Sequence, residues 1–190
     1  MLIGSMISLK EYIKSDMARL SLTPTCAAFL RWYFFPQGST FPHDVWFRIV
    51  QKCKTSKILK YTVGIFAYFI ERHLSFKYGI HADTNTPIGK GLRIVHGSGV
   101  FLNCESIGDN FTVYQNVTLG RGKKNKYTGK SIPTVENNVT VYTGAVVAGG
   151  VTLHEGCVIA ANSFVNRDVP AYTLVAGVPA QIIRSVKEGV

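Results

Sequence analysis

The sequence predicts an α+β protein in which a helical region, residues 1–78, precedes a coil of short parallel strands, residues 79–190. An aliphatic residue returns every six positions from Ile88 to Val165, whereas the residues before position 79 show helical spacing. The step is interrupted twice, by one extra residue between Val100 and Ile107 and by a polar, basic insertion between Leu119 and Val135, and it resumes after each. Such a step is typical of a hexapeptide β-helix, in which each hexad forms one flat side and three hexads complete a turn.

The first helix is expected from Leu9 to about Leu20, because Ser8 and Glu11 stand at capping-box spacing ahead of it. Thr23 before Pro24 predicts a second helix that ends at Phe35.

Two further helices are expected before the coil. Asp44 predicts the start of a helix over Val45–Cys53. Ser56 predicts the start of a longer helix that runs to about Lys77. Gly38, Ser39 and Pro42 predict a loop ahead of them.

These helices are strongly apolar and basic, which leaves two interpretations open. They pack on one another, on the coil or on a neighbouring subunit, or residues 1–78 make peripheral contact with a membrane. The second interpretation rests on Lys52, Lys54, Lys57 and Lys60 beside the apolar run Tyr61–Ile70. That run is too short to span a bilayer. The region carries a net charge of +7, from eleven Lys/Arg and four Asp/Glu, yet contains no nucleic-acid-binding motif, so no nucleic-acid partner is expected.

The coil is expected to begin at Ile80, with the first residue of each hexad pointing inward and the fifth small enough to share the interior. The fifth positions are Ser98, Cys104, Val117, Ala145, Val151, Cys157 and Ser163. Both late cysteines are therefore expected to fill the core rather than to act as nucleophiles.

The cysteines are far apart, which favours a reducing compartment, and Lys10 and Glu11 interrupt any apolar leader, so a cytoplasmic protein is expected. No metal site is expected, because His81, His96 and His154 lack a close pair of ligands.

The repeat breaks between Leu119 and Val135, which predicts an extruded loop. Its cations are Arg121, Lys123, Lys124, Lys126 and Lys130. The loop is either a ligand-contacting segment, basic enough to meet phosphate, or a solvated one. Past Val165 the tail is expected to leave the coil and to cap its open end.

One column of the predicted coil carries the candidate chemistry. With three hexads per turn, His96, Gln115, Thr143 and Ala161 occupy equivalent positions and stack about 4.8 Å apart. Three steps give roughly 14 Å, comparable with an extended pantetheine arm. A long thioester could lie along this column with its reactive end beside His96.

Three motifs resemble those of serine acetyltransferases in the hexapeptide-repeat acyltransferase superfamily. They are Gly91–Gly99 (GLRIVHGSG), Tyr114–Gly120 (YQNVTLG) and Ala176–Ala180 (AGVPA). The resemblance covers about residues 79–184, and the helical first third looks closer to relatives in polysaccharide biosynthesis. It implies a homotrimer of left-handed β-helices that transfers acetyl from acetyl-CoA to a hydroxyl.

By this resemblance, His96 matches the catalytic base, which would take the proton of the acceptor hydroxyl. The positions that match the CoA groove, or the segment closing over it, are Gly120, Thr143, Gly144, Ala161, Asn162, Gly177 and Pro179. Gln115, Arg121 and Lys123 are weaker candidates for binding substrate.

The sequence departs from the serine enzymes at groups that hold serine or orient the base. Val95 replaces an aspartate before the base, and Ser131 and Ile132 replace an arginine–histidine pair. The aspartate that orients the base falls near Gly79, so Asp83 is a candidate substitute.

These departures favour an uncharged acceptor, so the preferred prediction is O-acetylation of a sugar or glycan precursor, in the cytoplasm or at the inner face of the membrane. Two alternatives stay open: serine O-acetylation in cysteine biosynthesis, and a non-catalytic β-helix that binds a partner.

Overall fold

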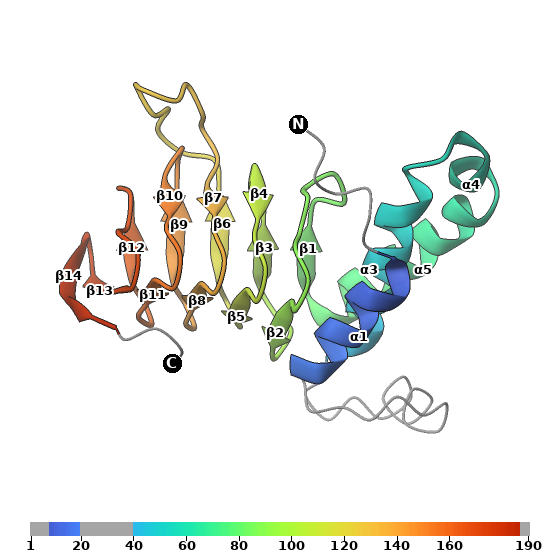
Figure 1. Cartoon of the computed structure of the whole chain (residues 1–190), viewed down its shortest axis with the longest axis horizontal. Helices are drawn as coiled ribbons and strands as arrows, with labels where there is room; N and C mark the ends of the chain where they lie inside the picture. The colour runs from blue at the N-terminus through green and yellow to red at the C-terminus, as the bar shows by residue number, and fades with distance from the viewer. Residues whose placement is uncertain (1–7, 20–39, 187–190) are drawn as a thin grey trace.

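The computed structural model describes residues 8–19 and 40–186, and shows a three-sided coil with helices at one end (Figure 1). Side A stacks β2 (Arg93–Val95), β5 (Thr112–Tyr114), β8 (Thr140–Val141) and β11 (Val158–Ile159). Side B stacks β1 (Ile80–Ala82), β3 (Val100–Leu102), β6 (Thr118–Gly120), β9 (Val146–Ala148) and β12 (Phe164–Val165). Side C stacks β4 (Ser106–Ile107), β7 (Thr134–Val135) and β10 (Thr152–Leu153).

The register of these strands confirms the six-residue repeat. On side A, Ile94 pairs with Val113, Val113 with Val141, and Val141 with Ile159, always three hexads apart and in parallel. Every repeated aliphatic residue from Ile88 to Val165 is at most 5% exposed. The coil core is therefore a stack of aliphatic layers, one from each hexad, as the period predicted.

The small residues at the fifth positions are buried as expected, with one exception. Burial raises the pKa of the Cys104 and Cys157 thiols to about 12, so both are protonated core residues. The prediction for Ser98 is wrong, because its side chain is exposed and its backbone has φ 96°. Ser98 lies in the first turn of the coil, whose backbone bonds to the end of the last helix through Ser98 N–H and the Tyr78 carbonyl.

The first helix, α1 (Leu9–Arg19), confirms the predicted capping box. The Ser8 N–H donates to Glu11 Oε2 at 2.7 Å, and the Glu11 N–H donates to Ser8 Oγ at 3.3 Å. A buried ion pair fixes α1 to the rest of the molecule, with Arg48 Nε 3.0 Å from Asp16 Oδ2. Arg48 also donates to the carbonyls of Ile88 and Gly89, so the pair joins α1 to the first hexad.

The other described helices differ from their predicted bounds. The third predicted helix, α3 (Phe41–Cys53), starts before the expected Asp44, so Asp44 lies inside its first turn and is buried. The predicted helix after Ser56 is divided at Thr62 into α4 (Lys57–Tyr61) and α5 (Val63–Tyr78). The helix predicted from Thr23 to Phe35 lies outside the described residues.

A buried polar cluster holds α5 against α3. The His43 ring is 3.3 Å from Asp44 Oδ1 through Nδ1 and 3.6 Å from Glu71 Oε1 through Nε2. Burial alone would lower the pKa of His43, but its hydrogen bonds to Asp44 and Glu71 raise it. Ser75 Oγ donates to Glu71 Oε1 at 2.7 Å and completes the cluster.

The two ends of the coil are covered, as expected for the tail. At the C-terminal end β13 (Thr173–Gly177) extends side A beside β11, and β14 (Ala180–Ser185) returns antiparallel to it. At the other end Phe47 of α3 belongs to the same buried core as the coil residues.

The division into two domains at residue 79 stays a prediction. Among the described helices, none has the length and apolar character needed to cross a membrane.

Candidate functional site

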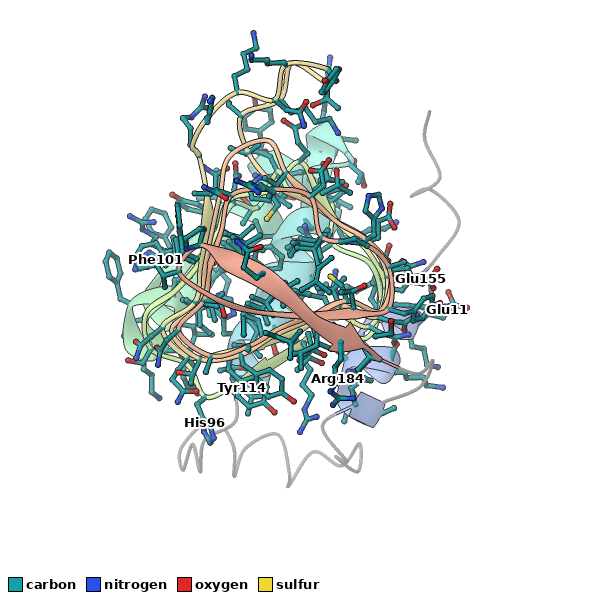
Figure 2. All side chains as sticks on the ribbon, turned by 90° about the vertical axis from the view of Figure 1, so that its left-hand side faces the viewer. Glu11, His96, Phe101, Tyr114, Glu155 and Arg184 are labelled. Atoms are coloured by element: carbon teal, nitrogen blue, oxygen red, sulfur yellow. The ribbon has the colours of Figure 1, made fainter. Side chains whose placement is uncertain are left out.

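His96 directly follows β2, at the corner where side A passes into side B. Its backbone φ is 61° and its side chain is exposed. Figure 2 looks along the coil and shows the labelled ring pointing outward from this corner, with the extruded loop at a different corner. A left-handed backbone conformation at a non-glycine residue is uncommon, and here it turns the imidazole away from the packed interior.

The predicted column is present at this corner. Since Ile94, Val113, Val141 and Ile159 stand in register, the residues two positions further on stack in the same order: His96, Gln115, Thr143 and Ala161. The turns are bonded to one another, because Thr143 Oγ1 and the Gly144 N–H both donate to the Gln115 carbonyl, at 3.1 and 3.2 Å. The column is therefore a continuous edge with the imidazole at its helical end.

Glycine lets the turns of this corner approach closely. Gly144 has φ 70°, and a Cβ there would lie 2.2 Å from Asn162 Oδ1. The tail continues the corner, because the Gly177 N–H donates to Ser163 Oγ at 3.3 Å. Thr143, Gly144, Ala161, Asn162 and the Gly177–Pro179 turn thus follow one edge from His96 toward the tail.

The end of α5 supports the turn that carries His96. A Cβ at Gly97 would lie 2.5 Å from the Tyr78 carbonyl oxygen and 3.4 Å from Thr40 Cγ2. The Val100 N–H donates to the Gly79 carbonyl at 3.1 Å. Sequence reasoning missed this support, although Gly79 carries a signal for it: a glycine directly after a helix is its usual left-handed C-cap, and its φ is 63°.

The other candidate residues lie at a second corner, where side B passes into side C. Gly120 ends β6, and the loop residues Arg121 and Lys123 follow it. Arg121 Nη1 donates to Ser131 Oγ at 2.9 Å, which closes the base of the extruded loop. One chain therefore does not bring Gly120, Arg121 and Lys123 to the corner of His96.

Asp83 also lies at this second corner. It follows β1, and its N–H donates to the Leu102 carbonyl, whereas the start of β1 lies beside the His96 turn. The Asp83 carboxylate accepts hydrogen bonds from Asn85, from the backbone N–H at 2.8 Å and from Nδ2 at 2.9 Å. Within one chain Asp83 is thus not placed to orient His96, and Gly79 is the residue that adjoins the turn.

A pair of aromatic rings borders the column, and sequence reasoning did not single it out. Tyr114 and Tyr142 stack with ring centroids 4.9 Å apart on the outer surface of side A. The sequence contains a signal for this pair, because Tyr114 and Tyr142 both occupy the second position of hexads that lie one turn apart. Together with the slim column they form one wall along which an extended ligand could lie.

The chemistry available at the His96 corner is that of a single exposed imidazole. A neutral imidazole accepts a proton and an imidazolium returns it near neutral pH, which suits general acid–base catalysis. Within residues 8–19 and 40–186, no group of three His, Cys, Asp or Glu side chains could hold a metal ion.

The register, the corner turns and the extruded loop together define a hexapeptide-repeat protein whose fold resembles the left-handed β-helix of serine acetyltransferases. The family model described as bacterial transferase hexapeptide (six repeats) matches residues 133–167.

Several serine acetyltransferases are similar to this chain in sequence or in structure. That of Staphylococcus epidermidis is 37% identical over 144 residues, which cover 75% of this chain and 64% of the relative, less than two thirds of its length. The crystal structure of the Neisseria gonorrhoeae enzyme in complex with serine has a TM-score of 0.69 at 25% identity, covering 93% of this chain and 69% of that one. A serine acetyltransferase structure in complex with CoA has a TM-score of 0.70 at 23% identity, covering 93% and 70%.

These matches confirm the predicted resemblance to serine acetyltransferases, and the predicted acyltransferase class agrees with the relatives' names. They also correct the predicted acceptor. The preference for a sugar or glycan precursor, and the link to polysaccharide biosynthesis, are wrong, because the relatives are named for serine. The preference rested on Val95, Ser131 and Ile132, which show that particular serine-holding groups are replaced but give no positive sign of a sugar.

Proposed function

We propose that the protein is a serine O-acetyltransferase that uses acetyl-CoA as acyl donor. The observation that carries the proposal is the exposed His96 imidazole at the head of the Gln115–Thr143–Ala161 column. The relatives support it, because they are named serine acetyltransferases and two solved ones hold serine and CoA. We also propose a cytoplasmic location, since Cys53, Cys104 and Cys157 are buried free thiols.

In the proposed reaction, the imidazole of His96 accepts the hydroxyl proton of serine as that oxygen attacks the thioester carbonyl carbon. The new C–O bond forms as the carbonyl π electrons move onto its oxygen. Collapse of this intermediate breaks the C–S bond, and the imidazolium returns its proton to the departing thiolate. The products are O-acetylserine and CoA, with no net proton change.

The column is proposed to hold the pantetheine arm of CoA. Thr143, Gly144, Ala161 and Asn162 offer small side chains along the edge, and the Gly177–Pro179 turn closes its far end. The Gln115 Oε1 atom is buried and accepts no hydrogen bond within the described part of the chain. We propose that the half-buried Gln115 side chain turns this oxygen toward the ammonium group of serine beside His96.

The first test measures thiol release from acetyl-CoA with L-serine as acceptor. H96A should lower kcat by roughly 10²–10⁴-fold while CoA affinity stays within about twofold. H154A is the matched control, because His154 belongs to side C and pairs with Glu136 at 3.1 Å. If H96A turned over as fast as the unaltered protein, His96 would not be the base. If the unaltered protein did not acetylate L-serine, the proposed acceptor would be excluded.

We propose further that the working form is a homotrimer, because the candidate residues of one chain are divided between two corners. In a closed threefold assembly, the Arg121–Lys123 corner of one chain can face the His96 corner of its neighbour. Loop cations would then approach the serine carboxylate or the phosphates of CoA.

Mixing two inactive variants tests this arrangement. H96A and the double variant R121A/K123A, co-assembled in equal amounts, should regain about one quarter of wild-type activity, because random mixing leaves about one interface in four with both corners intact. Each variant alone is the control. Mixed particles, verified by differential tagging, that show no gain over the two controls would exclude a shared site.

A further inference from the structure

Most large apolar side chains of helix α5 face solvent, and its buried residues are small or polar except for Leu74. Its buried residues, at helical spacing, are Gly64, Ala67, Glu71, Leu74 and Ser75. The residues toward solvent include Ile65 (50% exposed), Phe66 (66%) and Phe69 (67%). A surface helix of a globular protein normally has the reverse arrangement, so this exposed face needs a partner that is itself apolar.

The short helix α4 extends the same surface. Figure 1 shows α4 and the start of α5 at the end of the molecule farthest from the coil. The apolar face of the two helices consists of Ile58, Leu59, Tyr61, Val63, Ile65, Phe66, Tyr68, Phe69 and Phe76. An apolar cavity of 290 Å³ adjoins it, bounded by Val50, Cys53, Lys54, Gly64, Ile65, Tyr68 and Phe69.

The exposed charges around the apolar face are all positive. Lys52, Lys57 and Arg72 are exposed in α3, α4 and α5. The only acidic residues between positions 40 and 78 are Asp44 and Glu71, and both are buried against His43. The surface therefore combines aromatic and aliphatic side chains with exposed cations, of which Arg72 lies 4.8 Å from the centroid of the Phe76 ring.

This combination decides between two kinds of partner. A second copy of the chain, docked through the same face about a twofold axis, would bring lysines and arginines together without acids to pair them. The surface of an anionic bilayer offers apolar acyl chains together with negative headgroups. We propose that the α4–α5 apolar face docks on an anionic membrane surface and holds the protein there peripherally.

Flotation of the full-length protein with vesicles tests the proposal. Vesicles of phosphatidylcholine with 30% phosphatidylserine should carry the protein upward in a density gradient, and vesicles of phosphatidylcholine alone should carry much less. Raising the salt concentration should weaken binding to the anionic vesicles, because the cations contribute through screened attraction. Failure of the wild-type protein to float with the anionic vesicles would overturn the proposal.

Variants separate the apolar contribution from the charged one. F66S/F69S should lower the vesicle partition coefficient by at least roughly tenfold, because two inserted rings are lost. K57Q/R72Q should lower it by roughly 25-fold on anionic vesicles only, about fivefold for each cation. I183S is the matched control, since Ile183 is 58% exposed but lies on β14 at the opposite end. Equal flotation of all these variants would overturn the proposal.

Two further measurements distinguish membrane docking from misfolding of the variant and from self-association. Circular dichroism and the thermal midpoint should be unchanged in F66S/F69S, because both rings are exposed, and thiol release in solution should stay at the wild-type level. Analytical ultracentrifugation reports self-association. A wild-type particle that F66S/F69S splits into smaller ones, without vesicle binding by either, would assign the face to a second copy and overturn the membrane proposal.

Discussion

Replacing Gly97 with alanine should show how far catalysis depends on the contact between α5 and the His96 turn. The new Cβ would lie 2.5 Å from the Tyr78 carbonyl oxygen and 3.1 Å from Tyr78 Cβ. An unstrained contact needs about 3.5 Å, so the turn and the helix end must separate by about 1 Å. Both contacts involve the backbone or its first side-chain atom, so rotation of a flexible side chain cannot relieve them.

A displacement of about 1 Å at a catalytic group costs up to roughly 100-fold in rate. We expect G97A to lower kcat for acetyl transfer to L-serine by that factor, and CoA affinity to change by less than about threefold. Overpacking should also lower the free energy of unfolding by about 1–3 kcal/mol. Kinetics with varied acetyl-CoA and serine, and urea denaturation, measure the two effects.

The variant G108A separates loss of stability from displacement of His96. A Cβ at Gly108 would lie 2.5 Å from Asn137 Oδ1 and 2.7 Å from the Glu136 carbonyl carbon, a comparable steric burden beyond side C. It should lose similar stability and keep its kcat. If G97A turned over as fast as the wild-type protein, the inference that α5 positions His96 would be refuted.

Three further predictions concern stability. Burial raises the pKa of Asp16 from 3.8 to about 6 despite its pair with Arg48, so the folded state binds a proton more tightly than the unfolded chain does. The free energy of unfolding should therefore fall by about 3 kcal/mol as pH rises from about 4 to 7. The D16N variant should flatten this pH dependence in urea titrations at several pH values. L119A removes a fully buried side chain from a central layer and should cost about 2–5 kcal/mol by chemical denaturation, while L119M should cost less than about 1.5. S8A removes the capping-box hydroxyl and should cost about 0.5–2 kcal/mol, seen in the thermal midpoint, whereas S106A, outside any cap, should not.

The coil was predictable in detail because its repeat fixes both burial and register. Once Ile94 and Val113 are assigned to equivalent hexads, the parallel pairing of their strands and the stacking of His96 on Gln115 follow without further information. The helices lacked such a constraint. Asp44 has the residue type of a helix start, but α3 begins three residues earlier, after Thr40, and Asp44 contacts Thr40 and His43 within the first turn. The break at Thr62 has no proline to predict it, and Gly64 lies inside the helix that follows.

The site was predictable only where it depends on the coil. The His96 column follows from the repeat, whereas its support by Tyr78 depends on how α5 meets the first turn, which no periodicity encodes. The position of Asp83 shows the same limit. A shift of four residues along β1 moves a side chain to the other corner of the coil, so closeness in sequence to Gly79 did not imply closeness to His96.

The covered ends of the coil have a consequence for how the protein behaves at high concentration. A bare parallel coil presents a ladder of unpaired N–H and C=O groups at each end, onto which another chain could polymerise into filaments. Here α-helices cover the first turn, and β14, with an irregular pairing between Leu174 and Val175, runs against the direction that a further turn would need. Both covered ends thereby oppose the addition of further parallel turns along the axis.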